Sequence, residues 1–346
     1  MNLDWKNLSF QYMPTNGFVQ VDYANGEWGT PEIKTDPFIP LHIAASCLHY
    51  GQACFEGAKA FRTRSGDIVL FRPDENARRI AFSADRICMQ APPEELFMEA
   101  CQMVIRANAE FVPPYGTGAS LYVRPLLIGT EPTVGIKASD SYTFIILVTP
   151  VGPYYKDGFS PVDAVVIEGY DRAAPHGTGQ AKVGGNYAAS LKPGYMAKKL
   201  GYPVELFTDP RENKYVDEFG TSNFIGITHN GEYKTPSSSS ILASITNKSL
   251  QVLAEDMGLK IVREPIALDS LDQFAEVGAC GTAAVITPIS AVHYREKVFR
   301  FGKPDEAGPT LTKLFHDLQG IQYGEIADRH NWLMRIDVDT PSAARA

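Results

Sequence analysis

The chain has 346 residues, of which 44% are hydrophobic and 21% are charged, and its formal net charge at pH 7 is −8. This length predicts two domains, and the composition is typical of a globular protein. The negative charge and the lack of any Lys/Arg run argue against nucleic acid as a partner. The longest apolar stretch, 144–148, is far too short to span a membrane.

Cysteine and histidine usage points to a reduced chain without a metal centre. The five cysteines are odd in number and show no Cys-x-x-Cys spacing, and the seven histidines are scattered. Neither pattern predicts a metal site. No basic region followed by an apolar run stands after Met1, so we expect no secretory signal and a cytoplasmic location.

The first half of the chain predicts helices and strands in blocks. Its first forty residues indicate an extended arm and a hairpin. Asp74 is expected to cap a helix that runs to Met89, with Arg78 and Arg79 paired early in it. The remaining elements expected here are a helix over 93–111 and strands over 17–22, 68–71, 119–128 and 142–148. Elements in blocks, rather than in strict alternation, favour an α+β fold.

A Pro/Gly/Tyr-rich stretch near residue 150 is the best candidate for a domain boundary. We therefore predict a smaller α+β N-terminal domain over 1–152, an interdomain loop over 153–162 and a larger C-terminal domain over 163–346. The second half predicts strands at 163–168, 204–208 and 260–263, a helix from Asn186 interrupted by Pro193, a hairpin at Asn230-Gly231, a helix from Ser244–Thr246 to Met257, and a helix over 310–318.

The run from Gln180 to Ser190 carries Lys182 among small residues, just before a predicted helix. If this lysine is buried, desolvation lowers the pKa of its ammonium group and makes the amine available as a nucleophile or base. The two glycines that follow allow a flat ring to approach the backbone, and the hydroxyl of Tyr187 could bond to such a ring. The alternative is a solvated lysine in a glycine-rich turn.

Further features suit a ligand that is an aromatic aldehyde with a phosphate. Glu218, at the end of a predicted strand, could keep a pyridine nitrogen protonated. The helix start at Ile245-Thr246 and the turn Gly281-Thr282 could bind a phosphate, and Arg79 could add a forked contact. Each feature alone is weak, since solvated glutamates, helix starts and surface arginines are common.

Competing motifs fit the sequence less well. Residues 177–182 resemble a phosphate-binding loop only in passing, because the Gly-Lys-Ser/Thr ending is missing. The serines at 237–240 lack the glycines that flank a nucleophile elbow.

The order of six motifs resembles the branched-chain amino acid aminotransferases, which are pyridoxal phosphate enzymes of fold type IV. The resemblance runs from about residue 45 to Trp332. Its motifs are Phe55-Glu-Gly57-Ala-Lys-Ala-Phe61, Ser120-Leu-Tyr122-Val-Arg124-Pro125, Gly129-Thr-Glu-Pro132, Lys182-Val-Gly-Gly-Asn-Tyr187, Glu218-Phe-Gly-Thr221-Ser-Asn223 and Gly281-Thr282-Ala283. It implies a two-domain fold, similar to D-amino acid aminotransferase, with the cofactor at the domain interface.

The resemblance also implies roles for the residues that bind the cofactor. Lys182 resembles the Schiff-base lysine, which also moves the proton of the substrate. Glu218 resembles the carboxylate on the pyridine nitrogen, and Tyr187 resembles the phenol beside the ring oxygen. The positions that match phosphate-binding residues are Arg79, Ile245, Thr246 and Thr282. Thr221 is expected beside the cofactor and in the wall of the side-chain pocket.

The substrate positions follow in the same way. Tyr122, with the backbone of Thr282 and Ala283, resembles the site of the α-carboxylate, and Arg124 is expected near one end of the side-chain pocket. The pocket walls are matched by Tyr50, Phe55, Tyr154 and Thr221. Val134 and Ile136 match positions that a neighbouring subunit contributes, which implies a homodimer.

The activity implied is a ping-pong transfer of the amino group between L-leucine, L-isoleucine or L-valine and 2-oxoglutarate. D-amino acid aminotransferase and aminodeoxychorismate lyase share the fold type, and the motifs at 55–57 and 122–125 disfavour both. A non-catalytic vitamin B6 carrier would need no pair like Lys182 and Glu218. The Cys-x-x-Cys of mammalian members is missing after Ala283, so we expect no thiol regulation of that kind.

Overall fold

The computed structural model describes residues 3–152 and 158–338. The chain forms two compact units, of which the first comprises Met1–Tyr154, Ala181–Gly184 and Ile321–Ala346 and the second comprises Tyr155–Gln180 and Gly185–Gly320. The first unit thus takes in two segments that are distant in sequence, one of which carries Lys182. The contiguous domains 1–152 and 163–346 remain a prediction.

An antiparallel sheet forms the base of the first unit. Its strand order is β19-β6-β5-β7-β8-β1-β2, with β3 paired to β1 and β4 paired to β7. The strands are β1 (Phe18–Ala24), β2 (Glu27–Trp28), β3 (Glu32–Lys34), β4 (Ala53–Phe55), β5 (Ala58–Arg62), β6 (Ile68–Phe71), β7 (Ser120–Gly129), β8 (Tyr142–Val151) and β19 (Leu333–Ile336). The expected N-terminal hairpin is formed by β1 and β2.

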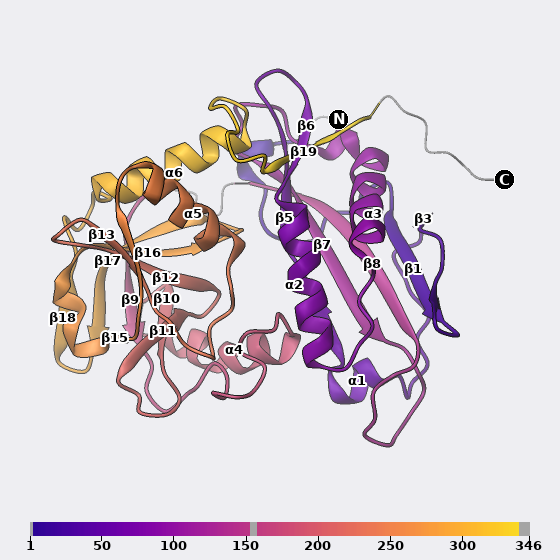
Figure 1. The fold of residues 1–346 in the computed structure, drawn as a ribbon, viewed down its shortest axis with the longest axis horizontal. Helices are drawn as coiled ribbons and strands as arrows, with labels where there is room; N and C mark the ends of the chain where they lie inside the picture. The colour runs from indigo at the N-terminus through magenta and orange to yellow at the C-terminus, as the bar shows by residue number, and fades with distance from the viewer. Residues whose placement is uncertain (1–2, 153–157, 339–346) are drawn as a thin grey trace. The chain divides into compact units, whose positions relative to one another are not determined.

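Two helices, α2 (Pro73–Arg86) and α3 (Glu94–Ala107), lie across one face of this sheet, and the short α1 (Ser46–Tyr50) lies at the end of the strands, in contact with β7 (Figure 1). α2 packs on α3 and β4, and α3 packs on β8 and β1; Ile80, Phe97 and Phe144 are fully or almost fully buried in this core. The expected N-cap at Asp74 was wrong. Arg72 occupies the cap with a left-handed φ of 47°, because Pro73 already has the backbone angle of a first helical residue.

In the second unit, a sheet closes on itself. The strands follow the order β14-β13-β12-β16-β17-β9-β10-β11-β15, and an added pairing of β11 with β12 closes a ring through β16, β17, β9 and β10. The strands are β9 (Val162–Val166), β10 (Val204–Thr208), β11 (Tyr215–Phe219), β12 (Ser222–Thr228), β13 (Glu232–Thr235), β14 (Lys260–Arg263), β15 (Ile266–Ala267), β16 (Phe274–Gly281), β17 (Val285–Tyr294) and β18 (Lys297–Arg300). Every ring strand contributes to one buried apolar cluster, which includes Phe219, Phe224 and Phe274.

The longer helices after β9 are α4 (Gly184–Lys199), α5 (Ile245–Asp256) and α6 (Pro309–Gln322). The expected hairpin at Asn230-Gly231 is present between β12 and β13. The expected interruption at Pro193 was wrong, because α4 continues through it. The proline leaves the carbonyl group of Ala189 without its helical donor, and Ala189 is exposed, so water can bond to that carbonyl. No helix among the described residues is long and apolar enough to cross a membrane.

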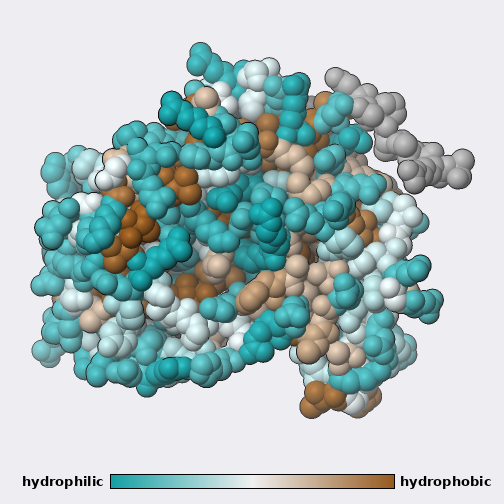
Figure 2. All heavy atoms as spheres, viewed as in Figure 1, coloured by the Kyte–Doolittle hydropathy of each residue, from teal (hydrophilic) through white to brown (hydrophobic). Residues whose placement is uncertain are grey.

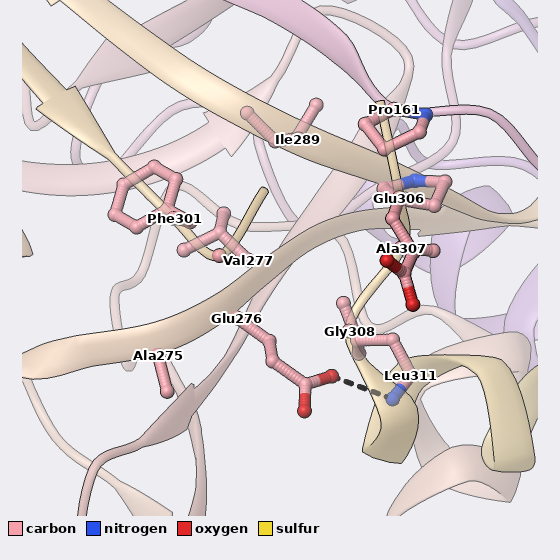
Figure 3. Close-up of a pocket in the computed structure, with 12 residues that line it drawn as sticks. Pro161, Ala275, Glu276, Val277, Ile289, Phe301, Glu306, Ala307, Gly308 and Leu311 are labelled. Carbon is pink, nitrogen blue, oxygen red and sulfur yellow. Dashed lines mark hydrogen bonds between the residues drawn. The ribbon is translucent and has the colours of Figure 1, made fainter. Parts of the chain in front are cut away.

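A carboxylate from the ring strands caps the start of α6. Glu276, on β16, accepts the backbone N–H of Thr310 at 3.1 Å and that of Leu311 at 2.8 Å. Figure 3 shows this side chain pointing at the helix start, beside a cavity with room for only about 10 Å³ of water. That is about one water molecule, so the cavity is no ligand site. Gly308 is required here, because a Cβ on it would lie 2.2 Å from the carboxyl carbon of Glu276.

We expect Glu276→Gln to destabilise the protein by about 1–2 kcal/mol, because one helical N–H then faces an amide group instead of a carboxylate oxygen. The measurement is the midpoint of urea unfolding. The matched control is Glu296→Gln in an exposed turn, which should leave the midpoint unchanged. Equal midpoints for the two variants would contradict the capping role.

Candidate active site

Lys182 is fixed in the first unit by its backbone. Its N–H donates to the hydroxyl of Ser83 on α2 at 2.9 Å, and its carbonyl accepts the N–H of Phe55 on β4 at 3.0 Å. The next residue, Val183, forms a β-bridge with Cys54. The segment that looked like a glycine-rich turn is therefore held between a helix and a strand.

The amine of Lys182 lies in cationic surroundings. Its Nζ is 4.9 Å from the centre of the Phe55 ring. Burial, followed by the neighbouring charge of Arg79, lowers the pKa of Lys182 to about 8; Arg124 acts in the same direction and Glu56 opposes it. An amine with this pKa has an appreciable neutral fraction near physiological pH, unlike an ordinary lysine, so it can act as a nucleophile or a base.

Arg79 and the fully buried Glu56 form a bidentate ion pair. The Nε and Nη2 atoms of Arg79 each donate to one carboxylate oxygen of Glu56 at 2.7 Å. Asn76 donates to the same carboxylate at 2.7 Å. These contacts fix the guanidinium of Arg79 in one orientation. The adjacent Arg78 is exposed instead and pairs with Asp74.

Tyr122 and Arg124 stand on β7 close to Phe55. An Nη2 of Arg124 donates to the hydroxyl of Tyr122 at 3.0 Å, and the guanidinium lies 4.9 Å from the ring centre of Phe55. The Nε of Arg124 is buried and has no partner among the described residues, so it is available to an acceptor on a ligand. Position 57 requires glycine, since a Cβ there would lie 2.2 Å from the hydroxyl of Tyr122 and would displace the tyrosine.

Three further predicted residues lie on the surface of the first unit. Val134 and Ile136, on the loop between β7 and β8, are 81% and 89% exposed. Tyr50, at the end of α1, donates its hydroxyl to the carbonyl of Val134. The predicted pocket residue Tyr154 lies outside the described residues.

Glu218 is buried in the second unit, on β11. Its Oε1 forms an ion pair with Arg172 Nη2 at 2.6 Å and accepts the N–H of Leu242 at 3.1 Å, and its Oε2 accepts the Asn223 amide at 2.8 Å. Burial raises the pKa of Glu218, and Arg172 opposes that rise. A carboxylate has about four acceptor positions, so one position on Oε2 remains for a further donor.

The start of α5 suits an anion. Ser244 caps the helix by accepting the N–H of Asn247 at 3.2 Å. The N–H groups of the buried Ile245 and Thr246 have no acceptor among the described residues. Unpaired N–H groups at a helix start carry the positive end of the helix dipole, which favours a phosphate.

The remaining predicted residues also belong to the second unit. Tyr187 is partly buried in the first turn of α4, and Thr221 is exposed in the turn between β11 and β12. Thr282 and Ala283 are partly buried in the turn between β16 and β17. Among the described residues, no cluster of three or more His, Cys, Asp or Glu side chains could hold a metal ion.

Sequence reasoning missed several neighbours of these residues. Glu56 stands inside a quoted motif but received no role, and Arg172 lies in a loop whose sequence shows no pattern. Phe10 contacts Tyr122 edge to face, with the ring centres 5.7 Å apart. Asn247 donates to Asn223 at 3.3 Å. These contacts join residues that are far apart in sequence, so no local spacing could reveal them.

A family model described as amino-transferase class IV matches residues 53–292 of the chain. The branched-chain-amino-acid aminotransferase of Haemophilus influenzae is 42% identical over 342 residues, covering 97% of this chain and 99% of that protein. The protein of the same name from Helicobacter pylori is 45% identical over 338 residues, covering 97% of this chain and 98% of that protein.

Solved structures are similar in fold. The branched-chain amino acid aminotransferase of Escherichia coli has a TM-score of 0.77 and 29% identity, covering 93% of this chain and 100% of that chain. A T.th. branched-chain amino acid aminotransferase, complexed with N-(5′-phosphopyridoxyl)-L-glutamate, has a TM-score of 0.77 and 25% identity, with 94% and 100% covered. The predicted α+β architecture of the fold type IV aminotransferases is thereby confirmed.

We expect an amine-directed reagent to label Lys182 half-maximally near pH 8 in the ligand-free chain, because its pKa is lowered to about 8. The internal reference is the exposed Lys303, whose pKa is raised by Glu306, so its labelling should need a pH of about 10 or more. Peptide mass spectrometry across a pH series measures both lysines in one sample. Identical titrations would contradict the assignment.

Proposed function

The chain belongs to the class IV aminotransferases, and we propose that it is a branched-chain-amino-acid aminotransferase that moves the amino group between L-leucine, L-isoleucine or L-valine and 2-oxoglutarate. The observation that carries this proposal is Lys182. Its amine, with a pKa of about 8, lies beside Phe55 and is flanked by two arginines, in a chain whose relatives carry that name over nearly their whole length.

Pyridoxal 5′-phosphate is the proposed cofactor, and the chemistry of the available groups fits it. The unpaired N–H groups of Ile245 and Thr246 suit its phosphate, with Arg79 and Thr282 as further ligands. The remaining acceptor position on Glu218 suits its ring nitrogen. Tyr187 is proposed to contact the ring oxygen and Thr221 to lie nearby.

The cofactor, when bound, supplies a carbonyl group for the amine and a ring that withdraws electrons. Lys182 would take the proton from Cα of the amino acid and return it, which an amine of pKa about 8 can do in both directions near neutral pH. Glu218 would hold a proton on the ring nitrogen, because an ionised carboxylate stabilises a protonated neighbour.

The substrate side follows from charge and polarity. Tyr122, with the backbone of Thr282 and Ala283, is proposed to bind the α-carboxylate. The wall for the branched side chain is proposed to comprise Tyr50, Phe55, Tyr154 and Thr221. Arg124, whose buried Nε lacks a partner among the described residues, would bind the second carboxylate of glutamate or 2-oxoglutarate. The other fold type IV activities, D-amino acid transamination and aminodeoxychorismate lysis, are not favoured by the relatives.

A homodimer is supported by an apolar patch of the first unit. It comprises Ile43, Leu48, Tyr50, Val134 and Ile136, all exposed. Figure 2 shows hydrophobic residues gathered where α1 and the β7–β8 loop lie. Such patches mark contact sites, and Val134 and Ile136 are proposed to complete the neighbouring subunit's pocket. A single-subunit mass of 38.0 kDa in light scattering would contradict the dimer.

A cytoplasmic location is proposed as well. No disulfide joins any of the five cysteines, all of which fall within the described residues. Recovery of the native protein from a compartment other than the cytoplasm would contradict this location.

We expect the protein loaded with pyridoxal phosphate to show a visible absorbance band that bleaches with L-leucine and returns with 2-oxoglutarate. Lys182→Ala should lose this band and the turnover, because no other amine is proposed to bond to the cofactor. The control Lys192→Ala, on the exposed side of α4, should keep both. Normal transamination of leucine by Lys182→Ala would overturn the assignment, and a band that responds only to D-alanine would move it to the D-specific branch.

We expect Arg124→Gln to slow the half-reaction with 2-oxoglutarate by about 10- to 100-fold in kcat/KM, because a charge-assisted hydrogen bond to its second carboxylate is lost. The half-reaction with L-leucine should change much less, since leucine has no second carboxylate. Stopped-flow absorbance measures the two steps separately. Equal losses in both would mean that Arg124 serves the α-carboxylate instead.

A further inference from the structure

Arg172 is a buried arginine that neither the motifs nor the comparisons single out. It follows β9 in a loop, and only 7% of the residue is exposed. Its Nη2 contacts Glu218 Oε1 at 2.6 Å, donates to the carbonyl of Gly179 at 3.0 Å and also donates to the carbonyl of Ser240. A buried guanidinium with one carboxylate partner and two carbonyl acceptors is a specific arrangement, because burying an unpaired cation is costly.

These contacts join three segments that carry proposed cofactor ligands. Glu218 lies on β11, Gly179 lies three residues before Lys182 in the chain, and Ser240 lies in the loop that leads into α5. Gly179 and Ser240 are in direct backbone contact, because a Cβ on Gly179 would lie 2.3 Å from the Ser240 carbonyl oxygen. Arg172 therefore contacts the carboxylate of Glu218 and also binds two loops, one before Glu218 in the sequence (at Gly179) and one after it (at Ser240).

The charge state of Glu218 depends on its neighbours. Burial raises its pKa, and Arg172 is the strongest opposing influence, followed by the Leu242 N–H and the Asn223 amide. The other titratable groups that face it are Asp217, whose negative charge also raises the pKa, and the thiol of Cys280. Without Arg172, a buried carboxylate would face another carboxylate and would take up a proton more readily.

We propose that Arg172 is a positioning residue that keeps Glu218 ionised and aimed in one direction, so that Glu218 can hold a proton on the cofactor's ring nitrogen. This inference rests on the proposed function. A neutral glutamic acid could still form a hydrogen bond to that nitrogen, but it would no longer stabilise the positive charge there.

The test is a double-mutant cycle with Arg172→Gln, Glu218→Gln and the combined variant. The matched control is Arg295→Gln, which breaks an exposed arginine–glutamate pair of 2.6 Å in the same unit. Arg172→Lys keeps the charge and serves as the conservative variant, and Arg172→Met, which removes the charge but keeps the length of the side chain, replaces Arg172→Gln in every comparison if the glutamine variant does not fold.

The first readout needs no cofactor: thermal unfolding of the ligand-free chain at several pH values. In Arg172→Gln, the pKa of Glu218 in the folded state rises further above its unfolded value. The unfolded state then binds fewer protons than the folded state, so stability should fall as pH rises above the unfolded pKa of about 4.3. Arg172 also lowers the pKa of Asp217, so Arg172→Gln is compared with the wild type, and the combined variant is compared with Glu218→Gln. The added pH dependence should be larger in the first comparison, because Glu218 contributes only there.

The second readout is the rate of the L-leucine half-reaction in loaded protein. Arg172→Gln should slow it by about tenfold or more, and Arg172→Lys should recover part of the loss. The combined variant should be no slower than Glu218→Gln alone, because Arg172 acts through Glu218. Arg295→Gln should match the wild type.

The outcomes separate this inference from the proposed function. Losses that add in the combined variant, or the same pH dependence with and without Glu218, would overturn the role of Arg172. An Arg172→Gln variant that behaves like Arg295→Gln would also overturn the role of Arg172. The proposed transaminase function would still be supported if the visible absorbance band of the wild type bleaches with leucine. A wild type that never shows a visible band would overturn both, and the unfolding cycle would then report an ion pair of structural importance only.

Discussion

The ion pair between Glu56 and Arg79 is the constraint on which the Lys182 surroundings depend. Arg79 and Arg124 both lower the pKa of Lys182, and Glu56 is the strongest opposing charge. If Glu56 were neutral or displaced, two partly buried cations and an amine would share one region without a compensating negative charge, which is costly. The two 2.7 Å hydrogen bonds from Arg79 to Glu56 therefore stabilise a positively charged region that suits anionic ligands.

The second unit also contains a buried arginine–glutamate pair, but there the glutamate, and not the arginine, is the residue proposed to bind the ligand. In the first unit, the carboxylate of Glu56 anchors Arg79, a proposed phosphate ligand. In the second, Arg172 anchors Glu218, a proposed ligand of the ring nitrogen. In each pair, the residue that we assign to the ligand was found in the sequence, and its partner was not. A charge buried for binding needs a buried counter-charge, and this need explains both partners.

The sequence predicted most elements, because hydrophobic periodicity and turn residues are local signals. The Asn230-Gly231 hairpin and the strand over 204–208 are examples. It predicted Lys182 through its small neighbours and through a motif order shared with a known family. It could not predict the roles of Glu56 or Arg172, since these depend on contacts across tens of residues. The errors at Asp74 and Pro193 were local too: proline at a first helical position is favourable, and the carbonyl that Pro193 leaves without a donor belongs to the exposed Ala189, where water can bond to it.

A continuous hydrogen-bond network connects Glu218 to the start of α5. The Asn223 amide donates to Glu218, Asn247 donates to Asn223 and to Thr235, and Tyr233 donates to Asn247 at 2.8 Å. Asn247 stands one residue after Thr246, so the network that holds the carboxylate proposed for the ring nitrogen is anchored directly beside the N–H groups proposed for the phosphate. Such networks are rigid when every member is satisfied. The distance between those two ligand groups is thus set by the protein before any ligand binds, which limits the entropy that binding must cost.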